Sequence, residues 1–415
     1  MNYKKNVYLF IVILLLGLPA AFFTHLFIFL IDQLSLNIIN YIANYNILIF
    51  IPAIGGLIVG LLLKYGTLTA KGHGVPLLIS SIKSNKKGLT KKDLHYEGLA
   101  TTFTVVSGGS VGLVGPIIEL TTGISDIIGR YLNFELKEYQ ILIGSAAAAG
   151  FSAVFMAPFA ATIFSLEVIH KNWSLKNIFY TITASFSSLL VMNLINPSYK
   201  YFFDFDIVIQ SLGRNQYIFL ILFTFLISLV GWLFINTLVL SGNIFSKLAI
   251  PFYYKPTLGG LLVGIIGYFY IEVLGTGSNI ISNFNDLDIP IILITSILVL
   301  KIIATSLSIG SGGSGGLFAP MILTGLLAGF LAGKIGLIFW PAFAINPIFL
   351  ALCGLVGILA GLIKTPIASI ILILELFYLP NLIVPLILAA FIPFIILNLM
   401  KVRSIYSPEL FNKEL

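Results

Sequence analysis

The chain alternates long apolar runs with short polar stretches. The apolar runs fall near residues 7–31, 46–63, 98–108, 115–130, 139–168, 176–195, 217–240, 246–274, 289–309, 317–339, 347–377 and 381–400. A helix needs roughly 20 apolar residues to cross a bilayer. Several runs are shorter, or carry glycine or proline in the middle, and backbone leaves a helix within a membrane only where protein or a polar cavity surrounds it. The pattern predicts an all-α polytopic membrane protein with broken or re-entrant helices.

The first apolar run follows Lys4 and Lys5, so a cleaved signal peptide is the alternative to a membrane helix. Leu18-Pro19-Ala20-Ala21 faintly resembles a cleavage site, but the run continues to about Ile31 without a polar break. A signal peptide ends sooner and at small residues. We therefore expect a first membrane helix over Asn6–Ile31 that is retained.

Composition supports a membrane protein and excludes other classes. Of the 415 residues, 58% are hydrophobic and 9% are charged, and the mean hydropathy is +1.05. Soluble domains carry about 25% charged residues, so a soluble enzyme is excluded. The single cysteine, Cys353, excludes a disulfide scaffold. The net charge of +7 fits cytoplasmic loops better than a nucleic-acid partner, and we expect no such partner.

Basic residues gather in some loops only, which predicts the orientation of the chain. These residues are Lys83, Lys86, Lys87, Lys91, Lys92, Lys171, Lys176, Lys401 and Arg403. The positive-inside rule assigns their loops, and both termini, to the cytoplasm, although the first cluster could instead bind lipid. The loop 196–216 has no basic excess and is expected outside. We expect a multi-pass protein of the plasma or inner membrane, with the lipid bilayer as a partner.

Four sequence blocks recur in the same order about 204 residues apart. Pro52–Gly60 resembles Pro256–Gly264, Gly72–Gly74 matches Gly275–Gly277, Gly115-Pro116 matches Ala319-Pro320, and Gly150–Pro158 with Glu167 matches Gly357–Pro366 with Glu375. The blocks predict two membrane repeats, 1–205 and 206–415, without a soluble regulatory domain. Because the second repeat begins after a loop expected outside, the repeats are expected to be inverted, as in transport proteins with a site at the repeat interface.

Three glycine-rich segments each lead into a proline at the start of a predicted helix. They are Lys71–Pro76, Gly108–Pro116 and Ser311–Pro320. Glycine lets the backbone approach a ligand closely, and proline in the first turn loses no hydrogen bond. The helix N-terminus then offers free N–H groups and about half a positive charge. The three segments predict an anion site, with tight helix packing through glycine as the alternative.

The sequence contains few other candidates for catalytic or metal-binding residues. The histidines His25, His73, His95 and His170 show no metal-ligand spacing, and the common catalytic motifs are absent. We therefore expect no enzyme, no metal and no cofactor. The acidic residues within apolar runs are Glu119, Glu167, Glu272 and Glu375. Intramembrane carboxylates are functional candidates, but Glu167 and Glu375 lie at equivalent helix ends and are expected to hold backbone amides or neighbouring loops.

The glycine-rich motifs resemble those of a known family. Gly72-His73-Gly74-Val75-Pro76, Gly112-Leu113-Val114-Gly115-Pro116 and Gly316-Leu317-Phe318-Ala319-Pro320 resemble, in order and spacing, the three filter motifs of the CLC chloride channels and transporters. Ser404-Ile405-Tyr406-Ser407 resembles the element with the family's pore tyrosine. The resemblance covers nearly the whole chain. The CBS domains that are common in eukaryotic members are not found in this sequence, so the resemblance implies a prokaryotic member.

The resemblance also implies partners, a ligand and an anion pathway. It implies a homodimer with one pore per subunit, and chloride or another halide as the transported ligand. The implied pathway residues are Gly72, His73, Gly74, Val75, Val114, Gly115, Leu317, Phe318 and Tyr406.

Three departures from the family pattern bear on the mechanism. His73 replaces a serine that usually contacts the ion; its imidazole can still donate a hydrogen bond, or it points away and the backbone amides bind. Val114 replaces the gating glutamate, and Val168 replaces the internal proton glutamate. Valine can neither mimic an anion nor carry a proton. The departures imply an anion channel that is not coupled to protons, with Val114 at the gate position.

The alternative function is an anion/proton antiporter, including a fluoride-selective one. Altered residues at the position of His73 occur among the family's fluoride exchangers, although those generally keep the gating glutamate. An antiporter would need another proton carrier, and His73 and Glu119 are the candidates.

Overall fold

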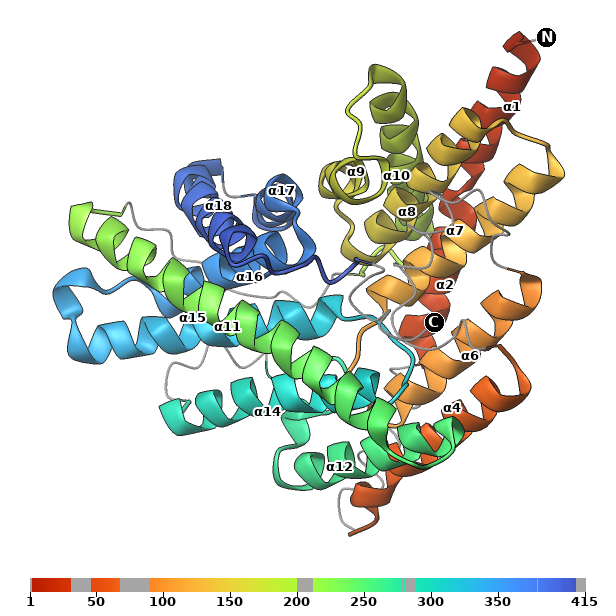
Figure 1. Cartoon of the computed structure of the whole chain (residues 1–415). Coiled ribbons are helices and arrows are strands. Elements are labelled where there is room, and N and C mark those ends of the chain that lie inside the picture. The colour runs from red at the N-terminus through yellow and green to blue at the C-terminus, as the bar shows by residue number, and fades with distance from the viewer. Residues whose placement is uncertain are drawn as a thin grey trace.

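The protein is built from helices of very different lengths that cross at many angles (Figure 1). The computed structural model describes residues 2–30, 46–67, 90–199, 212–277, 280, 289–378 and 380–407. The first half contains α1 (Asn2–Leu15), α2 (Gly17–Leu30), η2 (Asn46–Phe50), α4 (Ile51–Tyr65), α6 (Lys91–Val106), α7 (Val114–Tyr131), α8 (Leu136–Phe155), α9 (Pro158–Ser165), η4 (Leu166–His170) and α10 (Leu175–Ile195). The second half contains α11 (Arg214–Lys247), η5 (Phe252–Tyr254), α12 (Lys255–Phe269), η6 (Ile271–Val273), α14 (Ile291–Gly310), α15 (Phe318–Phe339), η8 (Pro341–Phe343), α16 (Pro347–Ile363), α17 (Pro366–Phe377), η9 (Pro380–Leu382) and α18 (Ile383–Leu399).

The lengths of the helices confirm a polytopic fold with broken helices. Within the described ranges, 7 helical segments are long and apolar enough to cross a membrane. The helix α11 has 34 residues, whereas α9 has 8 and α17 has 12. Helices this short cannot cross a bilayer on their own, and a helix end within the bilayer needs partners for its backbone groups within the protein.

The first apolar run differs from the prediction of one helix over Asn6–Ile31. It forms two helices, α1 and α2, that meet at Leu16. Pro19 has no N–H to donate to Leu15, so the helical hydrogen-bond ladder is interrupted there. A Cβ on Gly17 would also lie 2.6 Å from the backbone of Ser187 on α10, so the chain packs closely against its neighbour at the break.

The two repeats meet through contacts that occur twice with the partners exchanged. The helix α4 packs against α12 (Figure 1). A Cβ on Gly56 would lie 2.1 Å from the carbonyl oxygen of Pro256, and a Cβ on Gly260 would lie 2.0 Å from that of Pro52. Such close backbone contact allows only glycine. Gly56 and Gly260 are 204 residues apart, as the repeat predicts, while the expected boundary at residue 205 lies outside the described residues.

Two glutamates cap helices of the opposite repeat. The carboxylate of Glu167 accepts hydrogen bonds from the N–H groups of Ile367 and Ala368, at 3.2 and 3.0 Å, in the first turn of α17. The carboxylate of Glu375 accepts from the N–H groups of Phe159 and Ala160, at 3.1 and 2.9 Å, in the first turn of α9. The expectation that both glutamates hold backbone amides is confirmed.

Replacement of Glu375 by alanine is expected to lower stability more than it changes transport. The change removes both hydrogen-bond acceptors from the start of α9, and the loss of a helix cap costs about 1 kcal/mol. The check is the thermal unfolding midpoint of the purified protein in detergent, with Glu272→Ala as the control for the loss of an acidic group. An unchanged midpoint for Glu375→Ala, or an equal drop for the control, would contradict the cap.

Candidate anion site

Two glycine-rich loops from the two halves of the chain meet inside the protein. The N–H of Gly112 donates to the carbonyl oxygen of Gly316 over 2.7 Å, and the N–H of Gly316 donates to Gly112 over 2.7 Å. This bridge joins the loop before α7 to the loop before α15, so the two helices begin side by side (Figure 1). We term this contact between Gly112 and Gly316 the loop junction.

Neither glycine of the loop junction has room for a side chain. A Cβ on Gly316 would lie 2.9 Å from the nitrogen of Gly115 and 3.1 Å from the oxygen of Gly112. A Cβ on Gly112 would lie 2.7 Å from the Cβ of Ala319. These glycines therefore do allow tight packing, which was the alternative interpretation of the glycine-rich segments. The same packing brings the N-termini of α7 and α15 together.

The first backbone N–H groups of α7 and α15 are the candidate anion ligands. They belong to Val114 and Gly115 on α7 and to Phe318 and Ala319 on α15. An α-helix provides no internal acceptor for such groups, and neither helix has a side-chain cap among the described residues. Val114 and Phe318 are 1% and 2% exposed. Two buried positive helix ends at one place suit a small anion.

Aromatic rings connect the loop junction with Tyr406. The ring centroid of Phe164 lies 6.3 Å from that of Phe318 and 6.4 Å from that of Tyr406. Tyr406 is 2% exposed. The N–H of Ile405 donates to the carbonyl oxygen of Leu362 over 2.9 Å, which fixes this segment to the end of α16. Tyr406 thus lies in the same buried region as the start of α15.

Hydroxyl groups tie each loop to the opposite repeat. Ser110 Oγ and Thr305 Oγ1 lie 2.9 Å apart, and Ser314 Oγ and Thr101 Oγ1 lie 3.1 Å apart. Ser110 and Ser314 are equivalent positions of the two repeats, as are Thr101 and Thr305. The loop junction is therefore held by reciprocal hydrogen bonds as well as by packing.

One pair of equivalent residues carries opposite charges. Lys301 on α14 is fully buried, and its Nζ donates to the carbonyl oxygens of Val273 and Gly275, at 2.9 and 2.8 Å. The equivalent residue, 204 positions earlier, is Glu97 on α6. Glu97 is 3% exposed and accepts a hydrogen bond from Ser314 Oγ over 3.2 Å. Because the surrounding bonds are reciprocal, helix packing alone does not explain the difference in charge.

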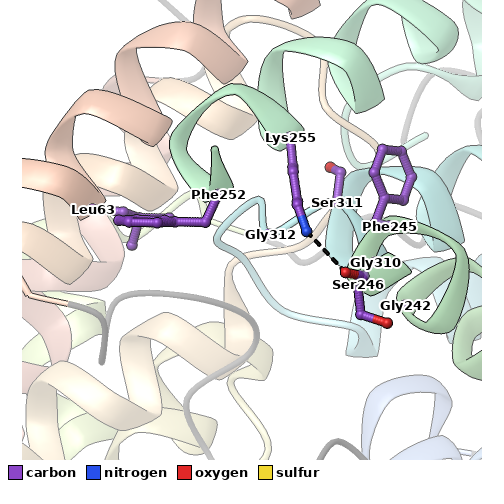
Figure 2. A pocket seen from close by; sticks show the side chains of 9 residues that line it. All are labelled: Leu63, Gly242, Phe245, Ser246, Phe252, Lys255, Gly310, Ser311 and Gly312. Carbon is purple, nitrogen blue, oxygen red and sulfur yellow. Dashed lines mark hydrogen bonds between the residues drawn. The ribbon is translucent and has the colours of Figure 1, made fainter. Parts of the chain in front are cut away.

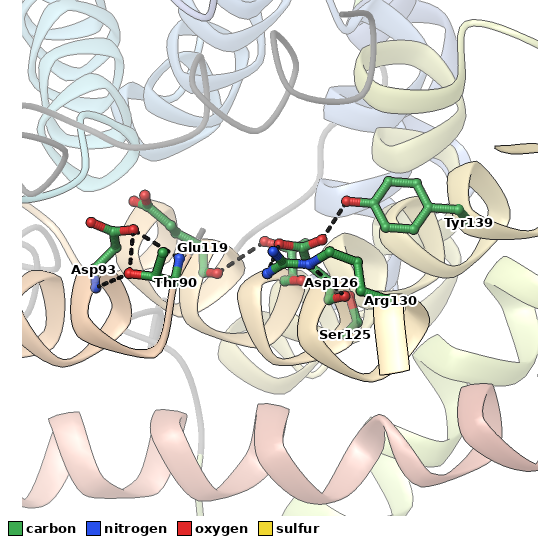
Figure 3. A network of polar contacts seen from close by, with 8 residues as sticks. Thr90, Asp93, Glu119, Ser125, Asp126, Arg130 and Tyr139 are labelled. Carbon is green, nitrogen blue, oxygen red and sulfur yellow. Dashed lines mark hydrogen bonds and ion pairs between the residues drawn. The ribbon is translucent and has the colours of Figure 1, made fainter. Parts of the chain in front are cut away.

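Glu119 on α7 is a second buried acidic residue near Glu97. It is 1% exposed, and its Oε2 has no hydrogen-bond partner among the described residues. Its carboxyl group interacts with that of Glu97 and with the charge of Asp93. Figure 3 shows the side chains of Glu119 and Asp93 next to each other, whereas Asp126 further along α7 is paired with Arg130.

A separate pocket lies next to the loop that precedes α15 (Figure 2). It is lined by Leu63, Gly242, Phe245, Ser246, Phe252, Lys255, Gly310, Ser311 and Gly312. Lys255 Nζ donates to the carbonyl oxygen of Ser246 over 3.2 Å. The lining includes neither Val114, Phe318 nor Tyr406, so this pocket is distinct from the candidate anion site.

Comparison with known proteins identifies the family. The sequence model of the family described as voltage gated chloride channel matches residues 55–398, which is most of the chain. The chain belongs to the voltage-gated chloride channel family. The family is one of ion channels and transporters, so its members move anions across membranes.

Curated relatives of this family member come from archaea and bacteria. A Methanocaldococcus jannaschii protein described as uncharacterized is 29% identical over 299 residues, which are 72% of this chain and 74% of the relative. The voltage-gated ClC-type chloride channel ClcB of Salmonella typhimurium is 28% identical over 329 residues, which are 78% of each chain.

Solved CLC structures share the fold of this family member. A slow cyanobacterial Cl⁻/H⁺ antiporter matches with a TM-score of 0.85 and 19% identity, over 97% of this chain and 96% of that one. A CLC-type fluoride/proton antiporter matches with a TM-score of 0.82 and 21% identity, over 98% and 99%. The chain thus has the CLC fold with its two inverted repeats.

The structure places several of the predicted anion-pathway residues close together. Val114, Gly115, Leu317 and Phe318 lie at the loop junction, and Tyr406 lies beyond Phe164. Val168, at the position of the lost proton glutamate, is buried in η4 with 6% exposed. The predicted residues Gly72, His73, Gly74 and Val75 lie outside the described residues.

Glu97 and Lys301 are two charged residues of this region that the apolar pattern of the sequence does not single out. Glu97 directly precedes the apolar run 98–108, and Lys301 is a single basic residue within the run 289–309. A residue-by-residue comparison of the two repeats would have found both, since the two residues occupy equivalent positions with opposite charges.

Proposed function

We propose that this family member moves chloride or a similar small anion across the membrane in exchange for protons. The loop junction supports anion passage, because it places two buried helix N-termini at one point. Exchange is supported by the solved neighbours, two of which are described as a Cl⁻/H⁺ antiporter and a fluoride/proton antiporter. The transported anion is then the ligand of the site, and the activity needs no further cofactor.

A passive anion channel is the second candidate function. Val114 and Val168, where the resemblance places the two proton-carrying glutamates, are buried and cannot bind a proton. The Salmonella typhimurium relative ClcB is described as a chloride channel, which points the same way. In this mode the anion would move down its gradient without any proton movement.

The experiment that separates the two functions is anion efflux from liposomes that contain the purified protein. External chloride, or fluoride, and external pH are recorded together, with protein-free liposomes as the control. Exchange predicts that protons move against their gradient at a fixed ratio to the anion. Anion efflux without proton movement would establish the channel instead, and the absence of efflux for either anion would contradict both functions.

We also propose a homodimer with one pore per subunit, in the plasma or inner membrane with both termini in the cytoplasm. The basic loops support this orientation. Large apolar side chains on α9 and α10, among them Phe159 and Leu190, are exposed on the single chain and offer a surface for lipid or for a second copy. Native mass spectrometry from lipid nanodiscs is expected to give the mass of two chains, and a mass of one chain would contradict the dimer.

A further inference from the structure

The carboxyl groups of Glu97 on α6 and Glu119 on α7 lie near each other in the interior, where the two helices pack together. Glu97 is 3% exposed and Glu119 is 1% exposed, and their side chains interact. We propose that Glu97 and Glu119 together form a proton-binding site that holds one proton, and that this proton is the one exchanged for the anion. The second part of this inference rests on the proposed exchange function.

Electrostatics favour one bound proton at this pair. Two carboxylates at close range in a water-poor interior repel each other strongly, so one of them stays neutral while the other ionises. Ser314 Oγ donates to Glu97 and so stabilises a negative charge there. Glu119 Oε2 is buried without a hydrogen-bond partner among the described residues, which suits a neutral carboxyl group better than a carboxylate. The proton belongs to the pair as a unit, as in other coupled carboxyl groups.

The described neighbours add little positive charge to the pair. Asp93, in the first turn of α6, acts on Glu119 and adds negative charge. The charged or imidazole side chains on the helices packed against α6 and α7 are His25 on α2, Lys64 on α4, Lys137 and Glu138 on α8 and Lys334 on α15. Three of them have other contacts: Lys64 lies over the Tyr253 ring, Glu138 accepts from its own helix start, and Lys334 donates to Ile289.

The pair is connected to the candidate anion site through Ser314. This residue lies two positions before Gly316 of the loop junction, and its hydroxyl contacts both Glu97 and Thr101. Loss or gain of the proton changes the total charge of the pair, and with it the strength of the hydrogen bond that Ser314 donates to Glu97. The same loop leads into the N-terminus of α15. Proton binding at the pair and anion binding at the helix ends thus act on one loop.

The residue equivalent to Glu97 in the second repeat carries the opposite charge and has different partners. The equivalent serine, Ser110, makes the same hydroxyl contact with Thr305, yet the residue equivalent to Glu97 is Lys301. Lys301 is satisfied by two carbonyl oxygens and so has a structural role. Glu97 instead faces a second acidic residue, an unfavourable arrangement unless a proton is bound.

Two measurements on the purified full-length protein in lipid test this inference. The first is the infrared C=O stretching band of protonated carboxyl groups at neutral pH. The second is the ratio of protons to anions in the liposome assay. The variants are Glu97→Gln, Glu119→Gln and the double variant, with Glu272→Gln as the matched control. We expect the band to weaken and proton movement to fall at least tenfold in the double variant, while anion efflux continues and the control resembles the natural protein.

The outcomes separate the proton site from the proposed function. A protonated-carboxyl band that is unchanged in all variants would overturn the proton site. A band that weakens while the proton-to-anion ratio stays normal would overturn the carrier role. No proton movement by the natural protein would instead overturn both the exchange function and the carrier role, with the band still deciding whether the pair binds a proton. Glu97→Asp and Glu119→Asp keep an acid at each position and are expected to retain both signals, which separates loss of the proton from misfolding.

Discussion

Anion transport by the Gly316→Ala variant is expected to fall at least tenfold. The new Cβ would lie 2.9 Å from the nitrogen of Gly115, which is one of the candidate anion ligands, and 3.1 Å from the oxygen of Gly112. Both are backbone atoms within the loop junction, so neither can rotate away. Overpacking of this kind costs about 1–3 kcal/mol, and the strain is relieved only if the two helix N-termini move apart.

The efflux rate per reconstituted protein measures this effect, and Gly242→Ala is the matched control. Gly242 lies on α11, where a Cβ would meet nothing within 4 Å. The control variant is expected to transport at the natural rate. Equal rates for Gly316→Ala, Gly242→Ala and the natural protein would show that the spacing of α7 and α15 at the loop junction does not matter for transport.

The Val114→Glu variant is expected to transport about tenfold more slowly at neutral pH and to recover as the pH falls. Val114 is the first residue of α7 and is 1% exposed. A carboxylate there would bind the free N–H groups of the helix start and compete with the transported anion. Below the pKa of the new carboxyl group the side chain is neutral, so the competition ends and the rate increases.

The pH profile of anion efflux checks this prediction, with Val114→Gln as the control. Glutamine has nearly the same shape as glutamate but no charge, so its rate is expected to lack the steep recovery at acidic pH. A Val114→Glu profile that matches the natural protein at every pH would remove Val114 from the anion pathway.

Much of the fold could be predicted from sequence because glycine and proline mark it so clearly. The recurrence of the Gly56 and Gly260 segments revealed two repeats, and the structure shows these glycines in reciprocal backbone contact. The positions of the helix caps followed from the equivalent places of Glu167 and Glu375. Helix breaks were harder to place, as Leu16 shows, because a break also depends on which neighbour the backbone contacts.

The candidate site was predicted less completely, for a physical reason. Hydropathy identifies a charge inside an apolar run but says nothing about which charges meet in space. Glu119 was recognised as a carboxylate in an apolar run, whereas its partner Glu97 lies at the edge of one. The two are on different helices, and their proximity is a property of how α6 packs against α7.

The exchange of helix caps between the repeats has a consequence for synthesis of the chain. The N–H of Ala160 is capped by Glu375, which is 215 residues further along. At ribosomal rates of about 5–20 residues per second, the start of α9 waits roughly 10–40 s for its acceptor. If α9 enters the membrane during that interval, its first N–H groups lack the acceptor that Glu375 provides in the finished protein. The membrane insertion machinery or a chaperone then has a defined period in which to shield them.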